Sequence, residues 1–350
     1  MSADVVSGAW WRRHRALVLL IAMLLVPALM LAAVAVYLDR RLAGIDRVPL
    51  EIPEAGRPVR PPSAGDSLNI LVVGADNGDE GVDIAAALAN GSWVPGQHRS
   101  DTLMVVHITA DRRQVDVVSL PRDSYVAIPG HGQDKINAAF SYGGPSLLVQ
   151  TVEQFTGMRI DHVAIMDWNG FRDLSAAVGG VEIYIPHTFR DPVHGNTWTE
   201  GYHILAGDEA LEYVRTRYGL PNGDFDRIQR QQNFVRELMR KLMAAGTVTN
   251  PARFLDVLGT LTSDLTVDDD FSSHEIEALA WSLRHVRPSD VQYLTSPMQR
   301  YAVTSAGASI IVPDVSRTRE LFTAVAEDHV ERYLAEYGDE GTLRSPHRVR

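Results

Sequence analysis

The stretch Asn69-Ile-Leu-Val-Val-Gly-Ala-Asp76 is an apolar run that ends at Gly74 and is followed closely by a carboxylate. A run that is apolar on both faces predicts a strand buried inside a sheet. Residues 102–109 and 114–120 also have strand character, and the polar segment 110–113 between them predicts a hairpin turn. These segments predict the first strands of a buried sheet.

Strands and helices alternate along the rest of the chain. Further strands are predicted at residues 125–128, 162–166, 181–185 and 291–294. Helices are predicted at residues 136–142, 145–155, 168–178, 207–218, 226–245, 251–261, 273–283 and 315–333. This order predicts the α/β class, as a three-layer α-β-α domain with a central mixed β-sheet.

Charged residues gather where predicted strands meet loops, in Val73-Gly-Ala-Asp76, Arg99-Ser-Asp-Thr102 and Ser119-Leu-Pro-Arg-Asp-Ser124. Ligands of open α/β sheets bind at such strand ends. Asp76 and Asp101 offer the paired carboxylates that Mg²⁺ needs when phosphate oxygens complete its coordination. Arg99 and Arg122 would add charge-assisted contacts to the same anion.

The same residues also have local interpretations. Asp76 could close a turn beside Gly74, and the arginines could simply pair with the neighbouring carboxylates Asp101 and Asp123. The acidic stretch that follows Asp76 also offers competitors for a metal, namely Asp79, Glu80 and Asp83.

The stretch from Tyr213 to Asn233 concentrates positive charge in a protein whose formal net charge is -11. Its arginines are Arg215, Arg217, Arg227 and Arg230. Residues 219–223 end one helix, and a second begins near Asp224 or Asp226, so that Arg227, Arg230 and Gln231 share a face at its start. Because a helix N-terminus attracts phosphate, the stretch predicts an anion site. The alternative is a solvated face with Asp–Arg pairs within the helix.

Residues 16–38 form an uncharged run between two arginine-rich flanks. The run is long enough for a bilayer core of about 30 Å and too long for a signal-peptide core. It predicts one N-terminal transmembrane helix, with residues 1–15 as a cytoplasmic tail and the proline-rich residues 39–66 as a spacer. Arginines on both sides leave the orientation undecided by charge, but the short tail favours a folded domain outside the cell membrane. We expect that domain over residues 67–335 and a disordered tail over residues 336–350.

The chain has no cysteine, which excludes zinc-thiolate sites, thiol nucleophiles and disulfides. Its acidic net charge argues against nucleic acid as a partner. Lys135 and Lys241 are the lysines among 33 basic residues, a bias typical of a GC-rich genome.

Several segments between residues 67 and 245 together resemble the LytR-CpsA-Psr family, in its actinobacterial type. The segments occur in the same order as in that family. They are residues 69–76, Arg99-Ser-Asp-Thr102, Leu120-Pro-Arg-Asp-Ser124, residues 135–144, Gly179-Gly-Val-Glu-Ile183 and the arginine run of residues 215–232. The last of these is highly specific. The resemblance implies a membrane-anchored, extracytoplasmic phosphotransferase that uses Mg²⁺. Members transfer a glycopolymer from a polyprenyl-pyrophosphate carrier to peptidoglycan.

Carried over by position, the resemblance makes Asp76 and Asp101 the metal-side carboxylates, with Asp79 still open as an alternative. It implies the pyrophosphate ligands Arg122, Lys135, Arg215, Arg217, Arg227 and Gln231, with Arg230, Asp123 and Asp224 in supporting places. The catalytic candidates are then Asp101, Arg99, Arg122 and Arg217, and Asp101 or Asp123 could act as the base.

We therefore expect an enzyme at the cytoplasmic membrane that forms a phosphodiester link to a peptidoglycan hydroxyl. The same site could instead act as a polyprenyl-pyrophosphate phosphatase with water as the acceptor. A third hypothesis is a protein that binds or regulates the lipid carrier without catalysis. The sequence does not distinguish teichoic acid, capsule and arabinogalactan, because all three would present the same pyrophosphate.

Overall fold

The computed structural model describes residues 36–37, 39–76, 84–192, 195–216, 224–243 and 251–349. The chain divides into two compact units, residues 1–44 and 45–350, and the sheet, the core and the candidate site belong to the second. Within the described residues, no helix is both long and apolar enough to cross a membrane. The predicted membrane helix, residues 16–38, lies outside the described part apart from Val36 and Tyr37.

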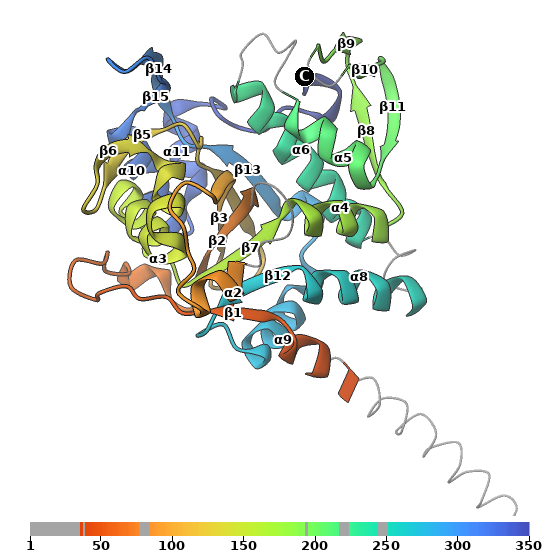
Figure 1. Cartoon of the computed structure of the whole chain (residues 1–350), viewed down its shortest axis with the longest axis horizontal. Helices are drawn as coiled ribbons and strands as arrows, with labels where there is room; N and C mark the ends of the chain where they lie inside the picture. The colour runs from red at the N-terminus through yellow and green to blue at the C-terminus, as the bar shows by residue number, and fades with distance from the viewer. Residues whose placement is uncertain are drawn as a thin grey trace, which may run out of the picture. The chain divides into compact units, whose positions relative to one another are not determined.

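A seven-stranded sheet forms the centre of the second unit (Figure 1). In spatial order its strands are β1 Asp46–Val48, β12 Leu265–Asp268, β7 His162–Asp167, β2 Leu68–Asp76, β3 Arg99–Ile108, β4 Val115–Ser119 and β13 Val291–Thr295. β2 is parallel to β7 and antiparallel to β3, while β4 is antiparallel to β3 and parallel to β13. The prediction of an α/β fold with a central mixed sheet is confirmed. β2, β4, β7 and β13 all end at one edge of this sheet.

The buried apolar side chains of the described residues form two separate cores. The first joins the sheet to α2 Ile84–Ala89, α3 Ile136–Thr156, α10 Val315–Ala326 and α11 Val330–Tyr337. Because side chains alternate along a strand, Leu71, Val73 and Ala75 of β2 all face this core. The second core joins α4 Trp168–Ala177, α5 Gly207–Arg215, α6 Asp224–Met243 and α8 Pro251–Ser263 to the paired strands β8 Val181–Ile185 and β11 Gly201–Leu205.

Among its described residues, the second unit also contains three short hairpins and one further α-helix. The hairpins pair β5 Tyr125–Ile128 with β6 Gly132–Lys135, β9 Phe189–Arg190 with β10 Thr197–Trp198, and β14 Met298–Val303 with β15 Ser309–Pro313. The helix is α9 Ser273–Ser282, whose capping box links Ser272 with Glu275. The sequence did not predict β1, β12 or the β14–β15 hairpin.

The long helix α3 is bent at the point where the sequence predicted a break between two helices. Gly143 and Gly144 have non-helical backbone angles, and Gly144 has a φ of 62°. Pro145 follows directly and cannot donate a hydrogen bond to the preceding turn. The two predicted helices at residues 136–142 and 145–155 are therefore one bent element.

The expected spacer over residues 39–66 is wrong for the part from residue 45 onward. β1 lies in the main sheet beside β12, and Val48 is fully buried. Arg57 binds the carboxylate of Glu153 on α3 at 2.7 Å. Proline content predicted an extended chain, but the apolar and charged residues between the prolines bind this segment to the domain.

The expected disordered tail over residues 336–350 is wrong for residues 336–349. The amide of Leu343 donates to the carbonyl of Tyr293 (3.0 Å), and the amide of Thr295 donates to the carbonyl of Gly341 (2.9 Å). These bonds cover the outer edge of β13, which would otherwise expose unpaired backbone groups. The predicted helix over residues 315–333 is also interrupted, since Asp328, with a φ of 57°, separates α10 from α11.

Candidate active site

Several of the predicted site residues lie at the edge where β2 and β4 end. Asp76 is the last residue of β2 and pairs in register with Arg99, the first residue of β3. Asp101 lies further along β3, and Arg122 follows the end of β4. Because β3 runs against both neighbours, its first residues lie beside the last residues of β2 and β4.

Four charged side chains form an alternating network at this edge. Arg122 donates a hydrogen bond to Asp101, and both side chains are only 11% exposed. The Nε of Arg122 lies 3.9 Å from Asp123, and the Nζ of Lys135 lies 2.9 Å from the same carboxylate. The order is therefore Asp101, Arg122, Asp123, Lys135, with each cation held by a carboxylate.

The backbone around Arg122 fixes this network against the start of α3. The amide of Ser124 donates to the carbonyl of Pro121 (2.9 Å), which closes a turn. The amides of Ile136 and Asn137 donate to the carbonyls of Ser124 (2.8 Å) and Arg122 (3.2 Å). Lys135 is the N-cap residue of α3, so the partial positive charge of that helix end lies beside the network.

A second pair of charges lies at the end of β2. Arg215, the last residue of α5, places its Nη2 3.5 Å from the Oδ2 of Asp76. Its guanidinium also lies over the ring of Trp168, 5.3 Å from the centroid. Trp168 begins α4 directly after β7, and the sequence analysis did not identify it as a site residue. Its position immediately after a predicted strand could have identified Trp168 as a candidate site residue.

Two arginines in the first half of α6, Arg227 and Arg230, are buried. Arg227 is 3% exposed and Arg230 is fully buried. Arg230 donates to the carbonyls of Tyr213 and Thr216 (both 3.4 Å), and its guanidinium stacks on the rings of Phe189 and Tyr213. Burial lowers the pKa of Arg230. In this geometry Arg230 joins α6 to α5, and its expected supporting role at the pyrophosphate site stays a prediction.

Gln231 has a similar position to Arg230. It is 7% exposed, and its Nε2 donates to the carbonyl of Val214 on α5 (3.4 Å). The predicted face of Arg227, Arg230 and Gln231 thus exists, and at Arg230 and Gln231 it packs on the end of α5. Arg217 and the competitors Asp79, Glu80 and Asp83 lie outside the described residues, as does the side chain of Asp224.

The sequence model of the LytR_cpsA_psr family matches residues 49–327 of this chain. The chain belongs to the LytR-CpsA-Psr family. One relative is the probable cell wall biosynthesis protein LcpB of Corynebacterium glutamicum, 35% identical over 261 residues that make up 73% of this chain and 60% of that protein. The resemblance read from the strand-end segments and the arginine run is therefore confirmed.

Two further members of the LytR-CpsA-Psr family extend the comparison. The polyisoprenyl-teichoic acid–peptidoglycan teichoic acid transferase TagU of Enterococcus faecalis is 36% identical over 204 residues, covering 57% of this chain and 62% of that protein. The crystal structure of TagV from B. subtilis superposes with a TM-score of 0.60 at 26% identity, covering 76% of this chain and 97% of that one. The chain spans about three fifths of the length of these two curated relatives, LcpB and TagU.

The carboxylates at the strand edge suit Mg²⁺ only if phosphate oxygens supply further ligands to the ion. Within the described ranges, no three or more acidic, histidine or cysteine side chains are grouped so that they could hold a metal ion. Asp76 and Asp101 lie on the neighbouring strands β2 and β3, and each of them contacts an arginine. Mg²⁺ commonly takes one or two protein carboxylates and completes its octahedron with water and substrate phosphates. This donor set fits that pattern.

Proposed function

We propose that this member of the LytR-CpsA-Psr family is a Mg²⁺-dependent phosphotransferase. In this proposal it moves a glycopolymer from a polyprenyl-pyrophosphate carrier to a hydroxyl of peptidoglycan. The observation that carries the proposal is the alternation of Asp101, Arg122, Asp123 and Lys135 at the edge of the sheet. A pyrophosphate could replace the carboxylates as the partner of these cations without any change of fold.

Similarity to named relatives supports the choice of substrates. The names of LcpB and TagU refer to cell wall biosynthesis and to transfer of teichoic acid to peptidoglycan. The arginine-rich edge suits a polyphosphate because a planar guanidinium binds phosphate oxygens in a bidentate way. A phosphatase would use the same edge, so the two activities differ in the acceptor.

The reaction makes and breaks one bond to phosphorus. The acceptor oxygen forms a new bond to the sugar-proximal phosphorus, and the bond to the bridging oxygen breaks. Polyprenyl phosphate leaves with the electron pair, and the hydroxyl proton passes to a carboxylate, for which Asp101 and Asp123 are the candidates. Arg122, Lys135 and Arg215 lie where they would stabilise negative charge that builds on the leaving phosphate.

Asp76 and Asp101 are the side chains that we expect to hold the metal. When bound, Mg²⁺ would add positive charge at the phosphate oxygens. Because each carboxylate also contacts an arginine, metal binding should be weak alone and stronger with pyrophosphate present. A titration with Mn²⁺ and inorganic pyrophosphate, followed by electron paramagnetic resonance, measures this directly. Equal Mn²⁺ affinity in wild type and Asp76→Asn would remove Asp76 from the metal site.

We also propose that residues 16–38 anchor the protein in the cytoplasmic membrane with the domain outside the cell. The uncharged run supports this proposal, and an anchor would keep the site near a lipid-linked donor. The full chain should sediment with membranes, and a chain that begins at residue 39 should not. A truncated chain that still sediments with membranes would contradict the anchor.

The transferase is tested by reconstitution of the reaction. Full-length protein in detergent is incubated with a polyprenyl-pyrophosphate saccharide, soluble peptidoglycan oligomers and Mg²⁺, and the glycan is analysed by mass spectrometry. We expect a phosphodiester-linked adduct with the wild type and none with Arg122→Ala or Asp101→Ala. Free sugar phosphate without adduct would indicate the phosphatase. Binding of the lipid with no turnover would leave the carrier-binding hypothesis.

A further inference from the structure

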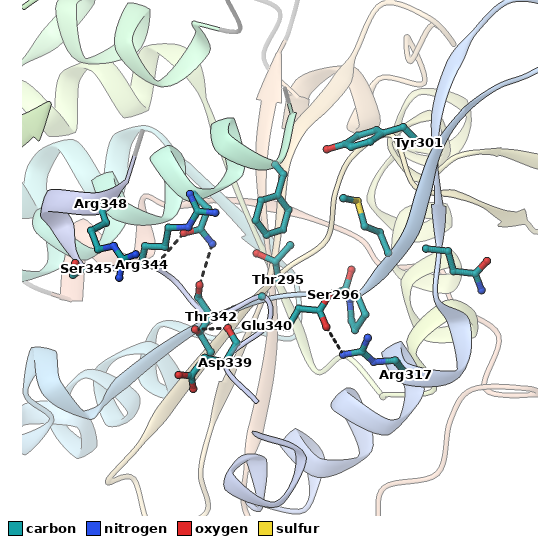
Figure 2. Close-up of a pocket in the computed structure, with 16 residues that line it drawn as sticks. Thr295, Ser296, Tyr301, Arg317, Asp339, Glu340, Thr342, Arg344, Ser345 and Arg348 are labelled. Atoms are coloured by element: carbon teal, nitrogen blue, oxygen red, sulfur yellow. Dashed lines mark hydrogen bonds and ion pairs between the residues drawn. The ribbon is translucent and has the colours of Figure 1, made fainter. Parts of the chain in front are cut away.

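A pocket of about 1090 Å³ lies between the start of α6, the end of β13, the β14–β15 hairpin and the C-terminal segment of residues 339–348. Figure 2 shows Arg344 and Arg348 on one wall, and Tyr301 and Arg317 on the opposite one, with Ser296 between them. The sequence predicted a disordered tail over residues 336–350, which include this segment. Its volume suits a ligand larger than a single sugar.

Three arginines, Arg317, Arg344 and Arg348, line the pocket together with the carboxylates Asp339 and Glu340. Arg317 is paired with Glu340 at 3.1 Å, and the Nη1 of Arg344 lies 3.8 Å from the buried carboxylate of Asp226. Arg348 is exposed and forms no ion pair with any residue in the described ranges. In a protein of net charge -11, this pocket therefore offers guanidinium groups to an anion.

Ser296 supplies a second observation that points to a ligand. It is 3% exposed and lines the pocket, and its Oγ has no hydrogen-bond partner within the described part of the chain. A buried hydroxyl without a partner costs free energy, which a polar ligand would recover. On the opposite wall Tyr301 is 49% exposed, so a face of its ring is accessible to an apolar surface such as that of a sugar ring.

The wall of the pocket is bonded to the segment that carries the charged network. The amide of Ser296 donates to the carbonyl of Ser119 at the end of β4 (2.9 Å). From β15, the amide of Ile311 donates to the carbonyl of Asp123 (2.9 Å). Two backbone hydrogen bonds therefore connect residues beside the pocket to the segment that precedes and contains Asp123.

We propose that this pocket is the acceptor site and that Arg344 and Arg348 bind a carboxylate of a peptidoglycan fragment. The inference rests on the proposed transferase function. The donor's phosphates are already matched by the network at the strand edge, so a separate set of arginines fits the second substrate. Peptidoglycan peptides carry carboxylates, and the planar fork of arginine matches a carboxylate in two parallel hydrogen bonds.

Direct binding tests the inference independently of turnover. Isothermal titration calorimetry compares a soluble disaccharide-peptide with free carboxylates and the same fragment with its carboxylates amidated, using the full-length protein in detergent. We expect the wild type to bind the free-carboxylate fragment about tenfold more tightly, the range of one charge-assisted hydrogen bond. Arg348→Ala should bind the free-carboxylate fragment more weakly than the wild type and show a smaller preference for it, because only Arg344 then remains for the carboxylate. Arg332→Ala is the matched control, because Arg332 is an exposed arginine beside a different hollow.

Transfer kinetics then separate this inference from the proposed function. Arg348→Ala and Ser296→Ala should raise the half-saturating concentration of the acceptor, about tenfold for Arg348→Ala, and leave that of the donor unchanged. Normal acceptor dependence in both variants, with an active wild type, would overturn the pocket assignment alone. Fragment binding that depends on Arg348, with no transfer by the wild type, would overturn the transferase alone. Absence of fragment binding by the wild type would also overturn the pocket assignment.

Discussion

Arg122 is the residue on which the proposed chemistry most depends, since its guanidinium contacts both Asp101 and Asp123. Removal of one preorganised donor from such a site typically costs about 10²–10³ in kcat. We expect kcat to fall by that factor in Arg122→Ala. The fall should be smaller in Arg122→Lys, because the lysine ammonium keeps the positive charge but cannot form the two parallel hydrogen bonds of a guanidinium. Arg113→Ala, at the exposed turn between β3 and β4, is the control. Full activity in Arg122→Ala would remove Arg122 from the site.

Asp116 gives the domain a pH-dependent stability that is unrelated to the site. It is fully buried in β4, where its Oδ1 accepts a hydrogen bond from Gln114 at 2.9 Å. Burial, with smaller effects of Glu331 and Asp328, raises the pKa of Asp116 to about 6. The folded state therefore holds this proton more tightly than the unfolded state. The contribution of Asp116 to stability is greatest below about pH 4 and falls as the pH rises to about 6.

Asp116→Asn removes this penalty and keeps an acceptor for Gln114. We expect the variant to be more stable than the wild type above pH 6 by up to about 3 kcal/mol, with the difference vanishing near pH 4. Urea unfolding of both proteins at pH 4, 6 and 8 measures it. A stability difference that does not change with pH would contradict the raised pKa.

At the scale of elements, the bend of α3 depends on Gly144. Its φ is 62°, and a Cβ there would lie 3.1 Å from the Cδ2 of Leu88 on α2. Gly157, at the C-cap of the same helix, has a φ of 76° but nothing within 4 Å of a Cβ. Gly157→Ala should cost about 1 kcal/mol for backbone conformation alone. Gly144→Ala should cost more, because its ψ of -156° lies in a region that is nearly restricted to glycine and because a Cβ would contact Leu88. Equal losses in chemical denaturation would show that neither feature of Gly144 matters for stability.

The elements also show which parts of the fold could be predicted from the sequence and which could not. Long apolar or periodic segments such as β2 and α6 were predicted because burial fixes their pattern. β1 and β12 were missed because these short strands, Asp-Arg-Val and Leu-Thr-Val-Asp, include charged residues that weaken an apolar strand pattern. The spacing of Arg227, Arg230 and Gln231 predicted a shared face correctly. It could not predict that Arg230 packs on Phe189 and Tyr213, because an arginine in a ring stack looks in sequence like a solvated one.

At the scale of the whole molecule, the C-terminal segment packs against β13 and α6 and should stabilise the domain. Its backbone covers the edge of β13, Val349 is fully buried, and Gln229 of α6 bonds the backbone of Thr342 and Arg344. Removal of residues 339–350 should lower stability on the order of 3 kcal/mol, or about 6 °C in Tm. Ser345→Ala is the control, because the Ser345 side chain makes no hydrogen bond within the described residues. An unchanged melting curve after truncation would mean that the segment does not stabilise the domain.

The proposed transfer reaction is tested most directly by following the sugar-proximal phosphorus atom of the donor into the product. A polyprenyl-pyrophosphate donor labelled at its sugar-proximal phosphate is offered to the wild-type protein together with peptidoglycan, and the label is followed after digestion of the glycan. If the edge network catalyses phosphotransfer, the label will be found in peptidoglycan, in a phosphodiester to the transferred saccharide, and Arg122→Ala will abolish it. Label recovered as free sugar phosphate, or left entirely on the lipid, would contradict the transferase.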